Sequence, residues 1–312
     1  MKKTFFSALE KSLTFFRKLG ISRKTPGVSS VYDFLFKIFW PYDQVLEIQG
    51  SKMYLNVDKS SPGMKRTIEA YASQKIHEKA TTDLFKKVLK EGNVFVDLGA
   101  NIGYFSLLAA KLVGPSGKVF SFEPEPKNYS YLKKNIDLNG YKQISAFQKA
   151  VSDKNGKTVL YVCDYDSGHH TINKYDGVKN YSSGRSTNER PIEIETMTLD
   201  GFFEGREDSI NVIKMDVEGA EYLALTGMDN ILKKNRHLKM FVEFFPLLIK
   251  GMGSSPEEFL RKLFKDYGFS VFLIPDDYDS SVHQLKKMES VQEILDLCKG
   301  KDDHVNLFLD HK

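Results

Sequence analysis

The sequence is poor in cysteine and in uninterrupted apolar runs. Only two of its 312 residues are cysteines, Cys163 and Cys298, which is too few for a disulfide framework and suits a reducing cytosol. No uncharged stretch approaches the roughly 18–20 apolar residues of a membrane-spanning helix. Residues 1–12 also lack the continuous apolar core of a secretory signal peptide. These absences predict a cytoplasmic protein with, at most, peripheral contact with a membrane.

Signatures of two further classes are also missing. The sequence has no compact spacing of metal ligands and no basic stripe in its main part, so we expect neither a metal requirement nor a nucleic-acid partner. The net charge is +4, but eight of the 45 Lys/Arg and only two of the 41 Asp/Glu lie in residues 1–40. This leaves 37 basic against 39 acidic residues elsewhere, so the basic character belongs to the N-terminus.

Residues 1–42 have the character of a separate extension. Large apolar residues alternate with basic ones up to residue 19, and an aromatic cluster precedes Pro41. A basic amphipathic helix of this kind can lie on an anionic membrane surface. The same pattern suits a helix that packs its apolar side on the rest of the protein, and both alternatives stay open. We place the boundary near residue 42 and predict one α/β domain over residues 43–312.

The main domain is organised around a short apolar run that breaks into a glycine-rich turn. Residues 94–98 suit a buried parallel strand, and apolar residues recur at helical spacing over residues 105–112. Ligands of open α/β sheets bind at such turns, because glycine lets the backbone approach the ligand and the helix N-terminus offers free N–H groups. The candidate ligand-binding residues of the turn are Asp97, Gly99, Asn101 and Gly103.

The turn departs from the pattern for dinucleotides. That pattern requires glycine at positions 99, 101 and 104, where this chain has Gly99, Asn101 and Tyr104. Glu123 follows 20 residues after Gly103, at the end of the next predicted strand, where a carboxylate can accept both hydroxyls of a ribose. This spacing resembles that of class I methyltransferases, which use S-adenosylmethionine. A dinucleotide-binding oxidoreductase is the alternative.

Further motifs strengthen the resemblance. The segments VDLGANIGYFS, FEPEPKNYSYLKKNI, KAVSD and IKMDVEGAEYLAL occur in this order, and Glu243 ends a later predicted strand. Together they resemble the FkbM family of S-adenosylmethionine-dependent methyltransferases, over roughly residues 70–250. The resemblance implies O-methylation of a hydroxyl on a sugar, a glycan or glycolipid, or a natural product, so the expected acceptor is a small molecule or a glycan. It also implies that Val151 and Ser152 lie near the adenine and that Asp216 lies beside the cofactor.

The expected fold is a doubly wound α/β sheet of seven mostly parallel strands, the last one antiparallel, with an N-terminal extension of helix and hairpin. The hairpin, over residues 45–49 and 53–57, should cover one side of the sheet, and a long helix should follow Pro62-Gly63 and reach Val88. Residues 199–203 are expected to turn after a short strand over residues 192–196. The strands of the sheet are expected at residues 94–98, 118–123, 143–151, 210–215, 239–244, 270–274 and 305–309.

Residues 163–191 form a polar insertion rich in Asp, Gly, Ser, Asn and Tyr, with His169 and His170 near its start. A segment of this length without secondary structure inside a domain is usually functional or disordered. We expect it to contact the acceptor, with tyrosines that stack on sugar faces. A solvated surface loop is the alternative, because loops collect these residues in any case.

Methyl transfer from a sulfonium is an in-line displacement, so it requires alignment of the acceptor oxygen with the methyl group and exclusion of water. A general base or a stabilising charge near the hydroxyl should assist. Carboxylates at one sheet edge could instead hold a hard cation such as Mg²⁺. The candidate catalytic groups are Asp216, Glu218, Glu243, His169 and His170.

A non-catalytic module at a membrane is the third alternative for the whole chain. A degenerate site should have lost at least one of the residues that carry the resemblance. All are present in this sequence, which argues against such a module: Asp97, Gly99, Gly103, Glu123 and Asp216. The sequence does not predict the oligomeric state.

The N-terminal extension generates a first prediction. Residues 1–40 should bind anionic vesicles, and salt should release the protein because exposed charges are screened. A protein that starts at Tyr42 should bind cofactor normally and fail to sediment with the vesicles. Equal sedimentation of the full and shortened chains would show that the extension makes no contribution.

Overall fold

The computed structural model describes residues 43–56, 76–163, 170–172, 189–206, 209–275, 284–300 and 304–311. The predicted extension over residues 1–42 lies outside these residues, as do the first part of the expected long helix and most of the polar insertion. Among the described residues, no helix combines the length and the apolar character needed to cross a membrane.

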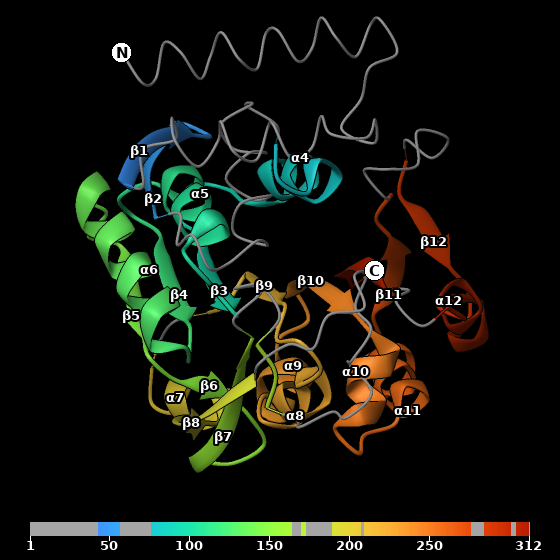
Figure 1. Ribbon diagram of the computed structural model, residues 1–312. Helices are drawn as coiled ribbons and strands as arrows, with labels where there is room; N and C mark the ends of the chain where they lie inside the picture. The colour runs from blue at the N-terminus through green and yellow to red at the C-terminus, as the bar shows by residue number, and fades with distance from the viewer. Residues whose placement is uncertain are drawn as a thin grey trace, which may run out of the picture.

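A single large sheet forms the centre of the domain (Figure 1). Its strands are β3 (Val94–Leu98), β4 (Lys118–Phe122), β5 (Ile144–Phe147), β9 (Val212–Met215), β10 (Lys239–Phe244), β11 (Ser270–Leu273), β12 (Lys286–Met288) and β13 (Val305–Asp310). They lie in the order β12-β11-β13-β10-β9-β3-β4-β5. The neighbours from β5 to β10 pair in parallel, whereas β13 is antiparallel to both β10 and β11.

This arrangement confirms the doubly wound, mostly parallel sheet with an antiparallel last strand. The edge strand β12 is one strand more than the seven expected, and it pairs antiparallel with β11 through Met288 and Val271. Three residues are too few to show an alternating pattern in the sequence, so this strand had no signal.

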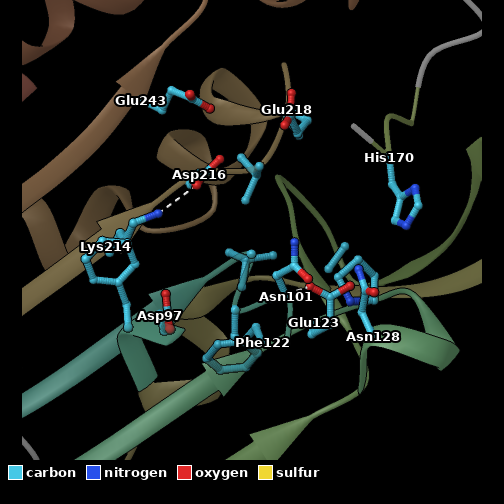
Figure 2. A pocket seen from close by; sticks show the side chains of 18 of the residues that line it. Asp97, Asn101, Phe122, Glu123, Asn128, His170, Lys214, Asp216, Glu218 and Glu243 are labelled. Carbon is cyan, nitrogen blue, oxygen red and sulfur yellow. Dashed lines mark hydrogen bonds and ion pairs between the residues drawn. The ribbon is translucent and has the colours of Figure 1, made fainter. Parts of the chain in front are cut away.

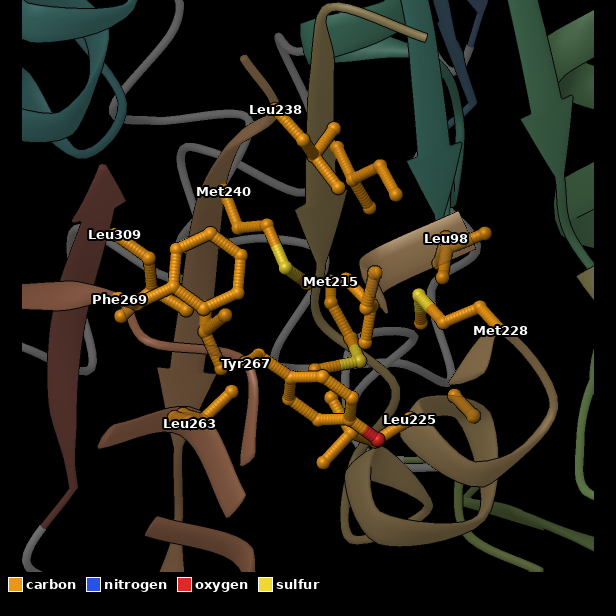
Figure 3. Close-up of a cluster of buried hydrophobic side chains, with 14 of the residues drawn as sticks. Leu98, Met215, Leu225, Met228, Leu238, Met240, Leu263, Tyr267, Phe269 and Leu309 are labelled. Atoms are coloured by element: carbon orange, nitrogen blue, oxygen red, sulfur yellow. The ribbon is translucent and has the colours of Figure 1, made fainter. Parts of the chain in front are cut away.

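Helices cover both faces of the sheet. One face carries α4 (Lys79–Val88), α5 (Tyr104–Val113) and α6 (Pro126–Asn139). The other carries α7 (Leu199–Phe203), α8 (Glu221–Thr226), α9 (Asp229–Lys234), α10 (Pro246–Gly251), α11 (Pro256–Arg261) and α12 (Val291–Leu297). Alternate residues of β3 enter the two cores, Phe95 the first and Val96 the second. Figure 3 shows part of the second core, whose buried side chains include Met215, Met240 and Tyr267.

The predicted hairpin is present as β1 (Asp43–Ile48) and β2 (Ser51–Asn56), which pair antiparallel. It lies on the side of the sheet that carries α5 and α6 (Figure 1), and β2 contacts both helices. The side-chain oxygens of Asn135 and Asn139 on α6 accept hydrogen bonds from the N–H groups of Tyr54 and Lys52. The hairpin is therefore an outer layer on this face.

The strand expected over residues 143–151 is wrong in its second half. β5 ends at Phe147, whose ring stacks on Phe122. The next residues form β6 (Ala150–Val151) in a separate sheet of order β6-β8-β7, with β7 (Gly156–Cys163) and β8 (Glu189–Met197). β8 contains the strand that we expected over residues 192–196. The chain thus leaves the main sheet after Phe147 and builds a second sheet beside it.

Residues 199–203, expected to turn, form the short helix α7. The Thr198 hydroxyl accepts a hydrogen bond from the N–H of Gly201, and Leu199 and Phe203 are buried in the second core. Five residues show too little helical periodicity to be recognised in a sequence. Helix α11 begins at Pro256, and the Ser255 hydroxyl caps it by accepting a hydrogen bond from the N–H of Glu258. A π-helical turn over Lys262–Asp266 follows α11.

Candidate active site

A cavity of about 330 Å³ lies at the carboxyl ends of β3, β4, β9 and β10 (Figure 2). The second sheet contributes Ala150 and Leu160 to its lining. Gly103 does not line the cavity, and His169 lies outside the described residues. The cavity brings together the other predicted site residues: Asp97, Gly99, Asn101, Glu123, Val151, Ser152, His170, Asp216, Glu218 and Glu243.

The glycines of the turn serve contacts within the protein. Gly99 has a φ of 83°, and a Cβ atom at this position would lie 1.8 Å from the carbonyl oxygen of Asp216. Gly103 has a φ of 101°, and its Cβ atom would lie 2.8 Å from the side chain of Leu132. A side chain at either position would therefore overlap with the end of β9 or with helix α6.

Glu123 follows β4 with its carboxylate held by two backbone groups. One oxygen accepts a hydrogen bond of 2.7 Å from the N–H of Asn101, and the other accepts one of 2.9 Å from the N–H of Glu125. Burial raises the pKa of Glu123 to about 8, although both N–H groups oppose this rise. Hydroxyl donors from a bound ligand would act in the same direction as these N–H groups and favour the charged form.

Asp97 is buried at the end of β3 and faces α5. Its Oδ2 accepts a hydrogen bond of 2.5 Å from the Ser106 hydroxyl, which lies 2.8 Å from the hydroxyl of Ser121. Burial raises the pKa of Asp97 to about 6, while the charge of Lys214 opposes the rise. Asp97 therefore links the end of β3 to helix α5 and adds negative charge to the cavity.

Buried Lys214 and half-buried Asp216 form an ion pair. The Lys214 Nζ lies 2.7 Å from Oδ2 of Asp216 and 4.7 Å from the centre of the Phe105 ring. Burial by itself lowers the pKa of Lys214, but the carboxylates of Asp216, Glu78 and Asp97 raise it above the ordinary value. For Asp216, burial acts upward, and Lys214 together with a hydrogen bond from Glu243 brings the pKa below the ordinary value. Asp216 is thus a charged carboxylate at neutral pH.

Glu243 holds the proton of this carboxyl pair. Burial, followed by the charges of Asp216 and Glu218, raises the pKa of Glu243 well above its ordinary value. One oxygen from each of the three groups lies within 4.8 Å of the others, a spacing that suits a hard cation. The three come from two strand ends, so the sequence could not show a compact ligand motif. Sensitivity of the activity to a chelator would test whether it depends on a metal.

Two described residues of the insertion line the cavity, Ile172 and the polar His170. Its Nδ1 accepts a hydrogen bond of 3.0 Å from the N–H of Cys163. The neutral ring then carries its proton on Nε2, which makes it a donor. In this arrangement His170 is suited to orient an oxygen atom and unsuited to remove a proton from it.

Several lining residues had no place in the predicted site, among them His77, Glu78 and Lys214. His77 and Glu78 precede α4, and the Nε2 of His77 lies 3.2 Å from an oxygen of Glu78. A helical pattern in the sequence concealed this pair, because the helix begins only at Lys79. The sequence contained a signal for Lys214 as a site residue, since it is a charged residue within the otherwise apolar strand β9.

Unfavourable backbone conformations gather at the cavity. Glu78, Asn101 and Glu218 have φ values of 41°, 49° and 50°, and all three line it. Left-handed conformations of residues other than glycine are uncommon and concentrate at functional sites. The glycine turn after β3, the loop after β9 and the start of α4 therefore contribute to a single site.

The order of the parallel strands, the glycine turn after β3 and the carboxylate after β4 define a class I methyltransferase fold. The chain belongs to the family of methyltransferase FkbM domains, whose model matches residues 97–271. The match begins and ends later than the resemblance of the motifs suggested.

Three curated relatives carry methyltransferase names. Methyltransferase sdnD of Sordaria araneosa is 30% identical over 197 residues, 56% of this chain and 73% of that protein. The 2-O-methyltransferase NoeI of Sinorhizobium fredii is 27% identical over 173 residues, 54% of this chain and 68% of that protein. The hexuronic acid methyltransferase AglP of Haloferax volcanii is 30% identical over 148 residues, 46% of this chain and 53% of that protein.

Among solved structures, methyltransferase FkbM from Methylobacillus flagellatus aligns with a TM-score of 0.37 and 14% identity. The alignment covers 82% of this chain and 56% of that one. A SAM-dependent O-methyltransferase from Thermotoga maritima aligns with a TM-score of 0.40 and 12% identity, and the alignment covers 89% of this chain and 81% of that one.

The contact between Gly99 and the end of β9 generates a prediction. Gly99→Ala should lower the free energy of unfolding by about 3 kcal/mol or more, because a left-handed alanine and a steric overlap add. Gly140→Ala is the control: its φ is 64°, and an added Cβ atom would meet nothing within 4 Å. The control should cost about 1–2 kcal/mol in urea unfolding. Equal costs for the two variants would contradict the contact.

Proposed function

We propose that the protein is an S-adenosylmethionine-dependent O-methyltransferase that acts on a hydroxyl of a sugar, a glycan or glycolipid, or a natural product. The observation that carries this proposal is that the glycine turn, Glu123 and Asp216 meet in one cavity at the carboxyl edge of the sheet. Membership of the FkbM family supports methyl transfer. The names of NoeI and AglP support transfer to oxygen and a sugar-like acceptor, respectively.

The donor set of the cavity fits S-adenosylmethionine. Glu123 presents a fixed carboxylate to the ribose hydroxyls, and the carboxylates of Asp97 and Asp216 favour a cation at the same edge. Val151 and Ser152 line the cavity and are the proposed adenine contacts. A volume of about 330 Å³ is in the range of small-molecule sites. When bound, the cofactor would supply an electrophilic methyl group on a positively charged sulfur.

The residues near Asp216 can align the acceptor. Because Lys214 keeps Asp216 charged, its carboxylate can accept a hydrogen bond from the acceptor hydroxyl and orient a lone pair of that oxygen. Glu243 retains a proton and can donate to the acceptor or to Asp216. His170 is a donor from another wall of the cavity. Positioning of this kind is the main requirement of an in-line methyl transfer.

The two alternative functions are an oxidoreductase and a non-catalytic module. The family match over residues 97–271 argues against a dinucleotide-binding oxidoreductase. A non-catalytic module would bind the cofactor without turning it over, so an assay decides this alternative. Contact of residues 1–40 with a membrane stays a separate prediction.

The function is tested by release of S-adenosylhomocysteine during incubation with a panel of sugar nucleotides, glycolipids, glycan fragments and hydroxylated small molecules. Turnover that depends on one acceptor class supports the proposal and names the substrate. Binding of the cofactor without turnover on any acceptor would instead support the non-catalytic module.

Glu123 generates a prediction for cofactor binding. Glu123→Ala removes the charged acceptor of two hydroxyls, so the affinity for S-adenosylhomocysteine should fall roughly tenfold to hundredfold in calorimetry. Glu91→Ala, on an exposed turn outside the cavity, is the control and should bind normally. Unchanged affinity in the Glu123 variant would remove this residue from the ribose site.

Asp216 generates a prediction for the methyl-transfer step. Asp216→Asn should lower the single-turnover rate by about 10²–10⁴, the usual effect of losing a group that handles the acceptor proton. His170→Ala should mainly raise the KM for the acceptor. Asp137→Asn, on the exposed side of α6, is the control.

The outcome for Asp216 is judged only in protein that is folded and binds cofactor. A near-normal rate in Asp216→Asn would refute its role. Loss of the wild-type rate in the presence of a chelator would make the three carboxyl groups a metal site instead.

A further inference from the structure

The end of the cavity opposite Glu123 carries an unexplained group of charges. Figure 2 shows Asp97 and Lys214 on the other side of Asn101 from Glu123. Glu78, which the segment before α4 brings to the cavity, interacts electrostatically with both Lys214 and Asp97. This end therefore combines residues from three separate parts of the chain.

The charges of the described residues at this end do not balance. Glu78, Asp97 and Asp216 contribute carboxylates, while Lys214 contributes an ammonium group that is paired with Asp216. The Asp97 carboxylate is buried and accepts a hydrogen bond from Ser106. The surplus of negative charge favours a ligand with a positive group here.

The surroundings of Glu78 keep its side chain charged and maintain its backbone conformation. Burial raises the pKa of Glu78, but the hydrogen bond with His77 and the charge of Lys214 bring it below the ordinary value. The His77 ring, which contacts the Glu78 carboxylate, packs edge-on against Tyr104 at a distance of 5.1 Å between ring centres. A left-handed φ of 41° at Glu78 opposes the preference of glutamate, so the surroundings maintain its position.

The length of the proposed cofactor connects the two ends. With its ribose on Glu123, the molecule must extend across the turn of Gly99 and Asn101, and its methionine part then reaches the end with Asp97 and Lys214. That part ends in an α-ammonium and an α-carboxylate group. We propose that Glu78 binds the α-ammonium group of the cofactor, an inference that rests on the proposed function.

The test compares two ligands that differ only in this group. S-adenosylhomocysteine carries the α-ammonium, and 5′-S-(3-carboxypropyl)-5′-thioadenosine lacks it. Calorimetry on the full chain should show that the wild type prefers the first ligand roughly tenfold to hundredfold, as expected for a charge-assisted hydrogen bond. Glu78→Gln should abolish this preference by weakening only the binding of S-adenosylhomocysteine.

A second carboxylate from the same part of the chain provides the control. Asp83 lies on α4, outside the lining of the cavity, and forms an ion pair with Lys79. Asp83→Asn removes one negative charge near Glu78 and should keep the preference between the two ligands. If Glu78→Gln fails to fold, Glu78→Asn replaces it, because asparagine tolerates the left-handed conformation.

The outcomes separate this inference from the proposed function. If the wild type binds neither ligand, the proposed cofactor is wrong and the inference falls with it. If the wild type binds both ligands equally, or the Glu78 variant keeps the preference, only the inference is overturned. Equal weakening of both ligands by Glu78→Gln also overturns it, since Glu78 would then act through the shape of the cavity.

Discussion

The site depends on the buried ammonium group of Lys214. It lies 2.7 Å from Asp216, and the charges of Glu78 and Asp97 also act on it. A buried charge is unfavourable unless opposite charges compensate it, so Lys214 and these carboxylates stabilise one another. Removal of the ammonium would leave several carboxylates together in a half-closed cavity. The residues before α4, the end of β3 and the end of β9 thus form one electrostatic unit.

The register of the parallel strands explains how this unit assembles. Asp97 on β3 lies opposite Lys214 on β9. Aligned residues of neighbouring parallel strands point to the same face, so both side chains are directed toward α5, where Ser106 and Phe105 receive them. The residues on either side of Lys214, Ile213 and Met215, enter the opposite core. A slip of one residue would bury the ammonium among apolar side chains, so the apolar pattern of β9 specifies the position of its charge.

The same logic separates what the sequence could predict from what it could not. Glu123 and Asp216 could be predicted as site residues, because the carboxyl ends of parallel strands meet at one edge of the sheet whatever the conformation of the loops. Glu78 was not, since its position depends on a left-handed residue at the start of α4 inside what looked like a continuous helix. The turn of the chain into β6 was equally hidden, because the residues of β5 and β6 have similar apolar character and belong to different sheets.

The glycines of the turn show a further limit of sequence reasoning. A glycine-rich turn predicts a close approach of the backbone to something, without identifying it. At Gly99 that partner is the backbone of Asp216, so the glycine acts on the site indirectly. It lets the end of β9 come close enough to β3 for Asp216 to share a cavity with Glu123. The glycine turn and the later acidic motif are therefore two halves of one contact.

The protonation of the carboxyl pair bears on how a hydroxyl would be methylated. Asp216, with its pKa below the ordinary value, is a weak base toward an alcohol but a good hydrogen-bond acceptor. The proposed cofactor would supply a good leaving group, so the acceptor hydroxyl would not need to lose its proton before the transfer. The proton would become strongly acidic once the oxygen is methylated, and even a weak base such as Asp216 could accept it. The group that orients the hydroxyl before the transfer is thus suited to receive the proton after it.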